Sequence, residues 1–129
     1  MTLLGCSLGP ALLGRRWLRA LFWGSVLGVL VLSLLPTDRL PEFVFDWWDK
    51  AQHALGFAWL ALCGRLAYPS RNVGLLLGLL ALGAFIEFAQ AATGWRQGDL
   101  ADWCADALGA LAVWGLFSCG APNCSKTAE

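Results

Sequence analysis

Residues 73–92 read VGLLLGLLALGAFIEFAQAA, an apolar run interrupted by only two strongly polar side chains, Glu87 and Gln90. An α-helix needs about 20 predominantly apolar residues to cross the hydrocarbon layer of a membrane, and this stretch has that length. The run therefore predicts a transmembrane helix. Glu87 lies about five residues before its end, which places a carboxyl group roughly 7 Å inside the boundary at 1.5 Å per residue.

Three further stretches predict membrane spans. They are residues 17–35 (WLRALFWGSVLGVLVLSLL), 51–68 (AQHALGFAWLALCGRLAY) and 101–120 (ADWCADALGALAVWGLFSCG). The second is the weakest, because it contains His53 and Arg65. A short polar tail follows at residues 121–129. We expect one domain over residues 1–129, an all-α polytopic membrane protein folded as a compact bundle of four transmembrane helices.

The composition supports this class. Hydrophobic residues make up 58% of the 129 residues and charged residues only 14%, whereas soluble domains carry about 25% charged residues. Nine basic residues balance nine acidic ones, and no nucleic-acid partner is expected. The five cysteines show no spacing typical of a disulfide framework or a zinc site. We expect no metal and no cofactor; the oligomeric state stays open.

The distribution of charge predicts the orientation. Six of the nine basic residues fall on the side of the predicted bundle that holds both termini, and eight of the nine acidic residues fall on the other side. Cytoplasmic loops of membrane proteins are enriched in Lys and Arg. We therefore expect both termini in the cytoplasm and the acidic side outside.

The connections between the last three spans are short, which makes successive helices antiparallel neighbours. Two glycine pairs, Gly24/Gly28 and Gly74/Gly78, have the small-xxx-small spacing that lets helices approach closely. We expect these pairs to support tight packing.

Polar residues recur at the predicted outer end with helical spacing. Asp49 and His53 are one turn apart, with Lys50 beside them, and Glu87 and Gln90 share a face of the third span. Asp99, Asp102 and Asp106 form one stripe that Gly109 continues, leaving room for a close neighbour, and Arg96 lies in the loop before it. Ionisable groups within a span are costly, so they usually turn inward and pair. The sequence predicts an outer polar pocket, with separate interfacial side chains as the alternative. Its candidate ligand-binding residues are Asp49, Lys50, His53, Glu87, Gln90, Arg96, Asp99, Asp102 and Asp106.

Four motifs in order carry a family resemblance. LSLLP, DKAQH, IEFAQ and WRQGDLADWCADALG resemble the pattern of the VanZ-like family of small bacterial membrane proteins, D-K-x-x-H, E-x-x-Q, R and D-x-x-x-N-x-x-G. The resemblance covers residues 32–115 and implies a multi-pass protein of the bacterial cytoplasmic membrane. The founding member is linked to teicoplanin resistance. Asp106 departs from the family's asparagine, which puts any role of that amide in doubt.

Several functions stay open. The favoured one is an envelope accessory protein that interacts with membrane lipids and binds a lipid headgroup or cell-wall precursor, with bases holding phosphate or carboxylate. An alternative is an enzyme acting on a lipid or polyprenyl-linked headgroup, with His53 and Glu87 as acid and base and Asp102 orienting the histidine; Asp99, Asp102 and Asp106 are then alternative cation ligands. A third is a scaffold or assembly partner without a ligand. Proton or ion transport is disfavoured, because the inner halves of the spans are apolar apart from Arg65.

Overall fold

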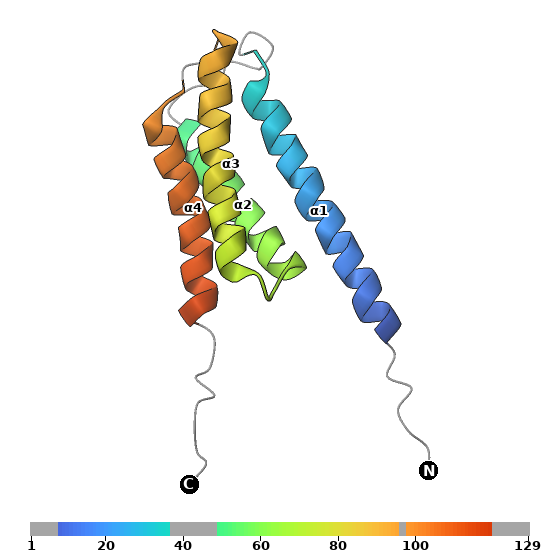
Figure 1. Cartoon of the computed structure of the whole chain (residues 1–129). Coiled ribbons are helices and arrows are strands. Elements are labelled where there is room, and N and C mark those ends of the chain that lie inside the picture. Colours follow the sequence, from blue (N-terminus) through green and yellow to red (C-terminus); the bar gives the residue numbers. More distant parts are fainter. Residues whose placement is uncertain (1–7, 37–48, 96–97, 120–129) are drawn as a thin grey trace, which may run out of the picture.

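The computed structural model describes residues 8–36, 49–95 and 98–119 (Figure 1). Its elements there are four α-helices, α1 (Leu8–Leu34), α2 (Asp49–Ala67), α3 (Asn72–Thr93) and α4 (Leu100–Cys119). The all-α class is confirmed for this part of the chain. The helix bounds agree with the predicted spans to within two residues, except that α1 begins at Leu8 rather than near residue 17.

Successive helices run antiparallel (Figure 1). The end of α1, the start of α2, the end of α3 and the start of α4 share one end of the bundle, which we call the polar end. The opposite end, where α2 connects to α3, we call the basic end. Helices α2, α3 and α4 lie close together, whereas α1 leans away from them toward the basic end.

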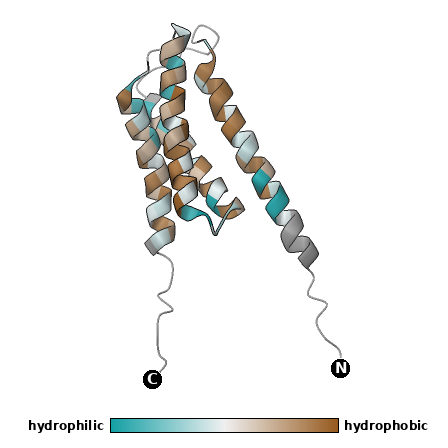
Figure 2. Cartoon of the chain, viewed as in Figure 1, coloured by the Kyte–Doolittle hydropathy of each residue, from teal (hydrophilic) through white to brown (hydrophobic). Residues whose placement is uncertain are grey.

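Three segments are long and apolar enough to cross a membrane, Gly14–Leu34 in α1, Asn72–Thr93 in α3 and Leu100–Ser118 in α4. Figure 2 shows the predominance of apolar residues along them. Helix α2 is not among these segments, since charged and polar residues at its start, and Arg65 near its end, lower its hydropathy.

The core explains how a less apolar helix fits into this bundle. Half of the core residues lie on α2, which packs mainly against α4 and also against α1 and α3. Helix α2 is therefore surrounded largely by protein. The core residues are Phe22, Val26, Phe57, Leu60, Ala61, Cys63, Ala67, Leu79, Ile86 and Ala110.

Glycines set the closest helix contacts, but not the glycines that the spacing predicts. A Cβ atom at Gly109 would overlap the backbone carbonyl of Ala54, so α4 meets the backbone of α2 there. A Cβ at Gly64 would lie 2.6 Å from a methyl group of Leu75. The expectation for the two small-xxx-small pairs is wrong: no described residue comes within 4 Å of a Cβ built at Gly24, Gly28, Gly74 or Gly78.

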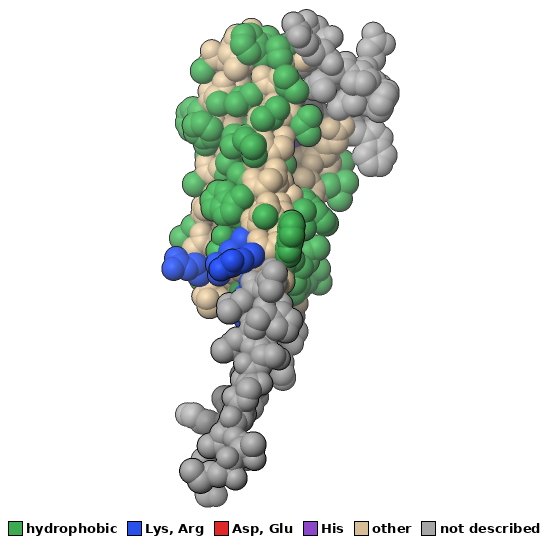
Figure 3. Space-filling view, turned by 90° about the vertical axis from the view of Figure 1, so that its right-hand side faces the viewer, with side chains coloured by type: hydrophobic (Ala, Val, Ile, Leu, Met, Phe, Trp, Pro, Cys, Tyr) green, Lys and Arg blue, Asp and Glu red, His purple; other side chains and the backbone are tan. Residues whose placement is uncertain are grey.

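Large apolar side chains cover the outside of the bundle. Phe88 is 78% exposed, and many leucines of α1, α3 and α4 are more than half exposed. Figure 3 shows such side chains spread over much of one face, above the basic side chains at its lower end. An apolar surface of this extent is unusual for a soluble monomer and typical of contact with lipid or a partner.

A recess of about 700 Å³ opens at the basic end between α1 and α3. Its polar lining includes Arg15, Arg19 and Arg71, and Figure 3 shows basic side chains gathered near the start of α1. The guanidinium of Arg19 lies 5.2 Å from the ring centre of Tyr68, whose hydroxyl accepts a hydrogen bond of 3.0 Å from Nε1 of Trp23. These contacts connect the splayed part of α1 to the end of α2.

Candidate functional site

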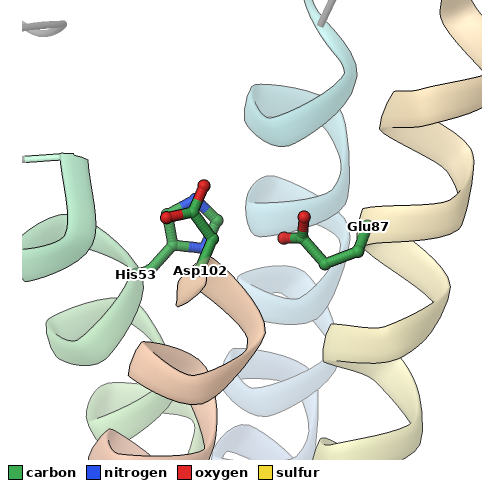
Figure 4. Close-up of side chains that lie close together, drawn as sticks. All are labelled: His53, Glu87 and Asp102. Atoms are coloured by element: carbon green, nitrogen blue, oxygen red, sulfur yellow. The ribbon is translucent and has the colours of Figure 1, made fainter. Parts of the chain in front are cut away.

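Six ionisable side chains from three helices and one loop meet at the polar end. We call them the polar cluster: Lys50, His53, Glu87, Asp99, Asp102 and Asp106. At its centre, one ligand atom each of His53, Glu87 and Asp102 lie within 4.8 Å of one another. Figure 4 shows Glu87 of α3 pointing across toward the other two side chains, on α2 and α4.

His53 and Asp106 form the buried base of the cluster. Nδ1 of His53 lies 2.9 Å from Oδ1 of Asp106, and the side chains are only 10% and 1% exposed. With Asp106 ionised, the Nδ1–H group donates this bond and orients the ring. The carboxylate that orients His53 is therefore Asp106. The sequence assigned this role to Asp102, which lies one turn earlier in α4.

The second oxygen of Asp106 is buried and has no hydrogen-bond partner among the described residues. It points toward Gly83 of α3, where a Cβ atom would lie 2.9 Å away. Glycine at this position lets the carboxylate fit between α3 and α4.

Lys50 joins α2 to the start of α4. Its ammonium donates hydrogen bonds to Asp102 at 2.9 Å and to Asp99 at 3.1 Å. Both bonds raise the pKa of Lys50 well above its ordinary value, and the bond to Asp102 contributes more than the bond to Asp99. The pair of carboxylates thus keeps the ammonium charged at the rim of the cluster, where its side chain is 57% exposed.

Asp99 also caps α4. Its Oδ1 accepts a hydrogen bond of 2.9 Å from the backbone N–H of Ala101, which satisfies one of the unpaired donors of the first turn. This bond, followed by the one from Lys50, lowers the pKa of Asp99. The side chain therefore stays ionised over the physiological range.

Glu87 connects the end of α3 to the same loop. Its Oε2 accepts a hydrogen bond of 2.7 Å from the backbone N–H of Asp99, whereas its Oε1 is buried and without a partner in the part of the chain that the structure describes. The loop comes close enough because Gly98 lies against the carbonyl of Glu87, where a Cβ would overlap, and because Gly94 ends α3 with a φ of 78°.

The structure brings together six of the nine predicted binding residues. Gln90 makes a different contact: it is buried, and its Nε2 donates a hydrogen bond of 3.0 Å to the backbone carbonyl of Ser33, so it attaches α3 to α1. Asp49 begins α2, but its side chain lies outside the described residues, as does Arg96.

Sequence reasoning missed two neighbours of the cluster. Gly83 lies one turn before Glu87, a spacing that places it on the same face, and could have been found from that spacing. Trp103 lies beside Asp102 and donates a hydrogen bond of 3.1 Å to the carbonyl of Leu80. No spacing in the sequence signals that contact, which joins α4 to α3.

The cluster offers three kinds of chemistry. Its carboxylate oxygens accept hydrogen bonds from hydroxyl or amino groups, the His53–Asp106 pair can move a proton, and the central His53, Glu87 and Asp102 can coordinate a cation. No family model, no curated protein and no solved structure matches this chain.

Proposed function

We propose that the chain is a VanZ-like envelope accessory protein whose polar cluster binds the headgroup of a membrane lipid or a lipid-linked cell-wall precursor. The observation that carries the proposal is the convergence of His53, Glu87 and Asp102 from three helices onto one point. Polar groups at membrane depth are costly and commonly mark a functional site. The four ordered motifs of the sequence resemblance supply the family.

The proposed ligand follows from the groups in the cluster. Carboxylate oxygens accept hydrogen bonds from the hydroxyl and amino groups of a sugar or peptide headgroup. Lys50, exposed at the rim, is the described cation available to a phosphate there, although Asp99 and Asp102 already bind it. A link to teicoplanin tolerance follows from the resemblance.

The proposal includes four spans in the bacterial cytoplasmic membrane, with the polar end outside and both termini inside. The length of α2 and its antiparallel course between apolar neighbours support a fourth span. The orientation is supported by the basic residues at the opposite end, Arg15, Arg16, Arg19, Arg65 and Arg71.

The orientation can be tested by labelling intact cells that express the chain without its native cysteines. A membrane-impermeant thiol reagent should label Gly94→Cys but not Ser70→Cys. Labelling of Ser70→Cys alone would mean that the chain has the opposite orientation in the membrane.

Binding can be measured by native mass spectrometry of the purified chain with a polyprenyl-pyrophosphate-linked disaccharide peptide. We expect a one-to-one complex that is weakened at least about tenfold by Glu87→Gln or Asp102→Asn, since each removes an acceptor charge at the centre of the cluster. Arg71→Gln, at the basic end, is the control and should bind normally. Equal binding by all four proteins would contradict the proposal.

The same variants test the link to teicoplanin in cells. Normal protein abundance together with lost tolerance supports a binding site. Loss of the protein from the membrane in every cluster variant would favour the scaffold, in which the cluster only holds the helices together.

The buried His53–Asp106 pair favours a second candidate, an enzyme acting on such a headgroup. An oriented histidine is a common general base, and Glu87, nearby, would be the partner acid. Incubating the purified protein with the lipid-linked precursor would then give a product of changed mass, and His53→Asn would abolish it. An unchanged precursor after prolonged incubation would contradict the enzyme and leave headgroup binding as the proposed function.

A further inference from the structure

The polar cluster carries an excess of negative charge. Among its described side chains, the carboxylates of Glu87, Asp99, Asp102 and Asp106 face a single ammonium, that of Lys50, and one imidazole. Asp102 and Asp106 are 7% and 1% exposed. Uncompensated buried charge is strongly destabilising, so such groups are usually paired or bound to metal.

Three of these side chains are placed as a set of metal ligands. The ligand atoms of His53, Glu87 and Asp102 lie within 4.8 Å of one another. Each lies about 2.1 Å from a bound zinc ion in known sites, and so roughly 3.4 Å from the next in a tetrahedral arrangement. A pair at the full 4.8 Å would have to close by roughly 1.4 Å, which rotation about the side-chain torsions of Glu87 can supply.

A separate group holds each of the three ligands. Asp106 binds Nδ1 of His53, Lys50 binds Oδ1 of Asp102, and the N–H of Asp99 binds Oε2 of Glu87. In Glu87 this bond engages Oε2 and leaves Oε1, which is buried and has no donor among the described residues, to the ion. Outer hydrogen bonds of this kind orient the ligands of metal sites, and the carboxylate–histidine–metal arrangement is a common form.

An independent observation also indicates a missing partner. Oε1 of Glu87 is buried and makes no hydrogen bond within the described chain. A carboxylate oxygen aimed into a cluster without a donor is the position that a cation would satisfy.

We propose that His53, Glu87 and Asp102 bind one divalent transition-metal ion, with Zn²⁺ preferred over Mg²⁺ and Ca²⁺. An imidazole with two carboxylates suits zinc, whereas magnesium and calcium favour oxygen ligands alone. Three protein ligands leave a fourth position for water or for an oxygen of a bound headgroup. A site of this kind departs from the expectation, drawn from the sequence, that the chain holds no metal. Its ligands also differ from Asp99, Asp102 and Asp106, the alternative cation ligands that the sequence suggests. Metal binding here does not depend on headgroup binding.

The test is a calorimetric titration of Zn²⁺ into the full chain, purified in a zwitterionic detergent, stripped with a chelator and free of added lipid precursor. We expect one ion per chain, not displaced by a large excess of Mg²⁺. Glu87→Gln and His53→Asn should each raise the dissociation constant for Zn²⁺ at least about tenfold. Arg71→Gln, at the basic end, leaves the polar cluster intact, and should stay within about threefold of the native chain.

Circular dichroism of each variant checks that the helices are retained. If His53→Asn fails to fold, Glu87→Gln compared with Arg71→Gln still decides the question, because the first replacement is isosteric and the second lies at the opposite end of the bundle. No zinc binding, or equal weakening by these two variants, would overturn the proposal.

Cobalt provides a second measurement, since the chain also contains cysteines, including the described Cys63 and Cys104. Co²⁺ bound to one imidazole and two carboxylates gives visible d–d bands without thiolate charge transfer. A thiolate band would overturn the assignment and indicate binding at cysteine. Zinc binding with the expected pattern but no complex with the lipid-linked precursor would refute the proposed function and leave the metal site intact.

Discussion

The polar and basic ends of the bundle hold their charged side chains in different ways. At the polar end, short carboxylates of α3 and α4 are turned inward and bind partners on other helices, as in the contacts of His53 with Asp106 and of Lys50 with Asp102. At the basic end, Arg15, Arg19 and Arg71 line an open recess and lie largely on the surface.

Side-chain length accounts for this difference. Arginine keeps its guanidinium at the surface while its stem lies along apolar groups, and the exposed Arg19 lies over the ring of Tyr68 at 5.2 Å. Aspartate cannot reach that far from a buried helix face. The polar end must therefore satisfy its charges internally, which requires close helix packing, whereas the basic end can stay open.

The largest loss of stability is expected when α2 is separated from α4 below the polar cluster, because the polar end depends on close helix packing. Gly109→Val places side-chain atoms against the backbone of Ala54, and we expect a loss of about 3 kcal/mol in the free energy of unfolding. Reversible unfolding in mixed micelles, followed by tryptophan fluorescence, measures it. Gly24→Val is the matched control, because a Cβ there meets none of the described residues, and it should change stability by less than about 0.5 kcal/mol. Equal losses would show that the close contact of α2 with α4 is absent.

A smaller effect is expected at the buried pair itself. Asp106→Ala leaves Nδ1 of His53 without its partner and should cost about 1–3 kcal/mol. Asp106→Asn keeps an acceptor oxygen, removes a buried charge and supplies the amide of the VanZ-like pattern, so we expect it to lie within about 1 kcal/mol of the native chain. The same unfolding measurement decides. An asparagine variant as unstable as the alanine variant would mean that the charge itself is required.

How far the sequence predicts these features depends on the kind of information each one needs. Apolar runs define the helices to within two residues, apart from the start of α1. Helical spacing also places Asp102 and Asp106 on one face. Which of the two meets His53 depends on the vertical register of α2 against α4, and that register is set where Gly109 contacts Ala54.

Gln90 illustrates a second limit. It shares a face with Glu87 by spacing, yet α3 packs against α4 and also against α1. Two residues on one broad face can therefore contact different neighbours, and Gln90 bonds to Ser33 of α1. Sequence spacing gives the face but not the neighbouring helix.

At the basic end, the link between α1 and α2 should be weaker than the contacts of the cluster. Tyr68→Phe removes the hydroxyl that accepts from Trp23 and keeps the ring under Arg19. We expect a loss of about 0.5–1.5 kcal/mol. Trp23 fluorescence, in a chain whose other tryptophans are replaced by phenylalanine, should report greater exposure of this side chain. An unchanged spectrum and stability would indicate that the recess is held by apolar contacts alone.

The smallest expected effect concerns the exposed bonds of Lys50, which give the polar end a dependence on pH. The pKa of Asp99 is lowered, by the N–H of Ala101 and then by Lys50, so its contribution to stability is present above about pH 3.9 and is lost as pH falls through its lower folded value. The pKa of Lys50 is raised, so its contribution is present below about pH 10.4 and is lost only as pH rises through its higher folded value. Between these limits neither group makes stability vary with pH.

Lys50→Met isolates this contribution. Unfolding of the variant at low ionic strength should show a shallower loss of stability below about pH 4 than the native chain shows. Because the bonds are exposed, about 1 M salt should make the native chain behave like the variant. Identical acid profiles at low salt would mean that the acid sensitivity of the polar end comes from the buried carboxylates. The contrast between the two ends would then rest on burial alone, and the salt bridges at the rim of the cluster would add nothing measurable to it.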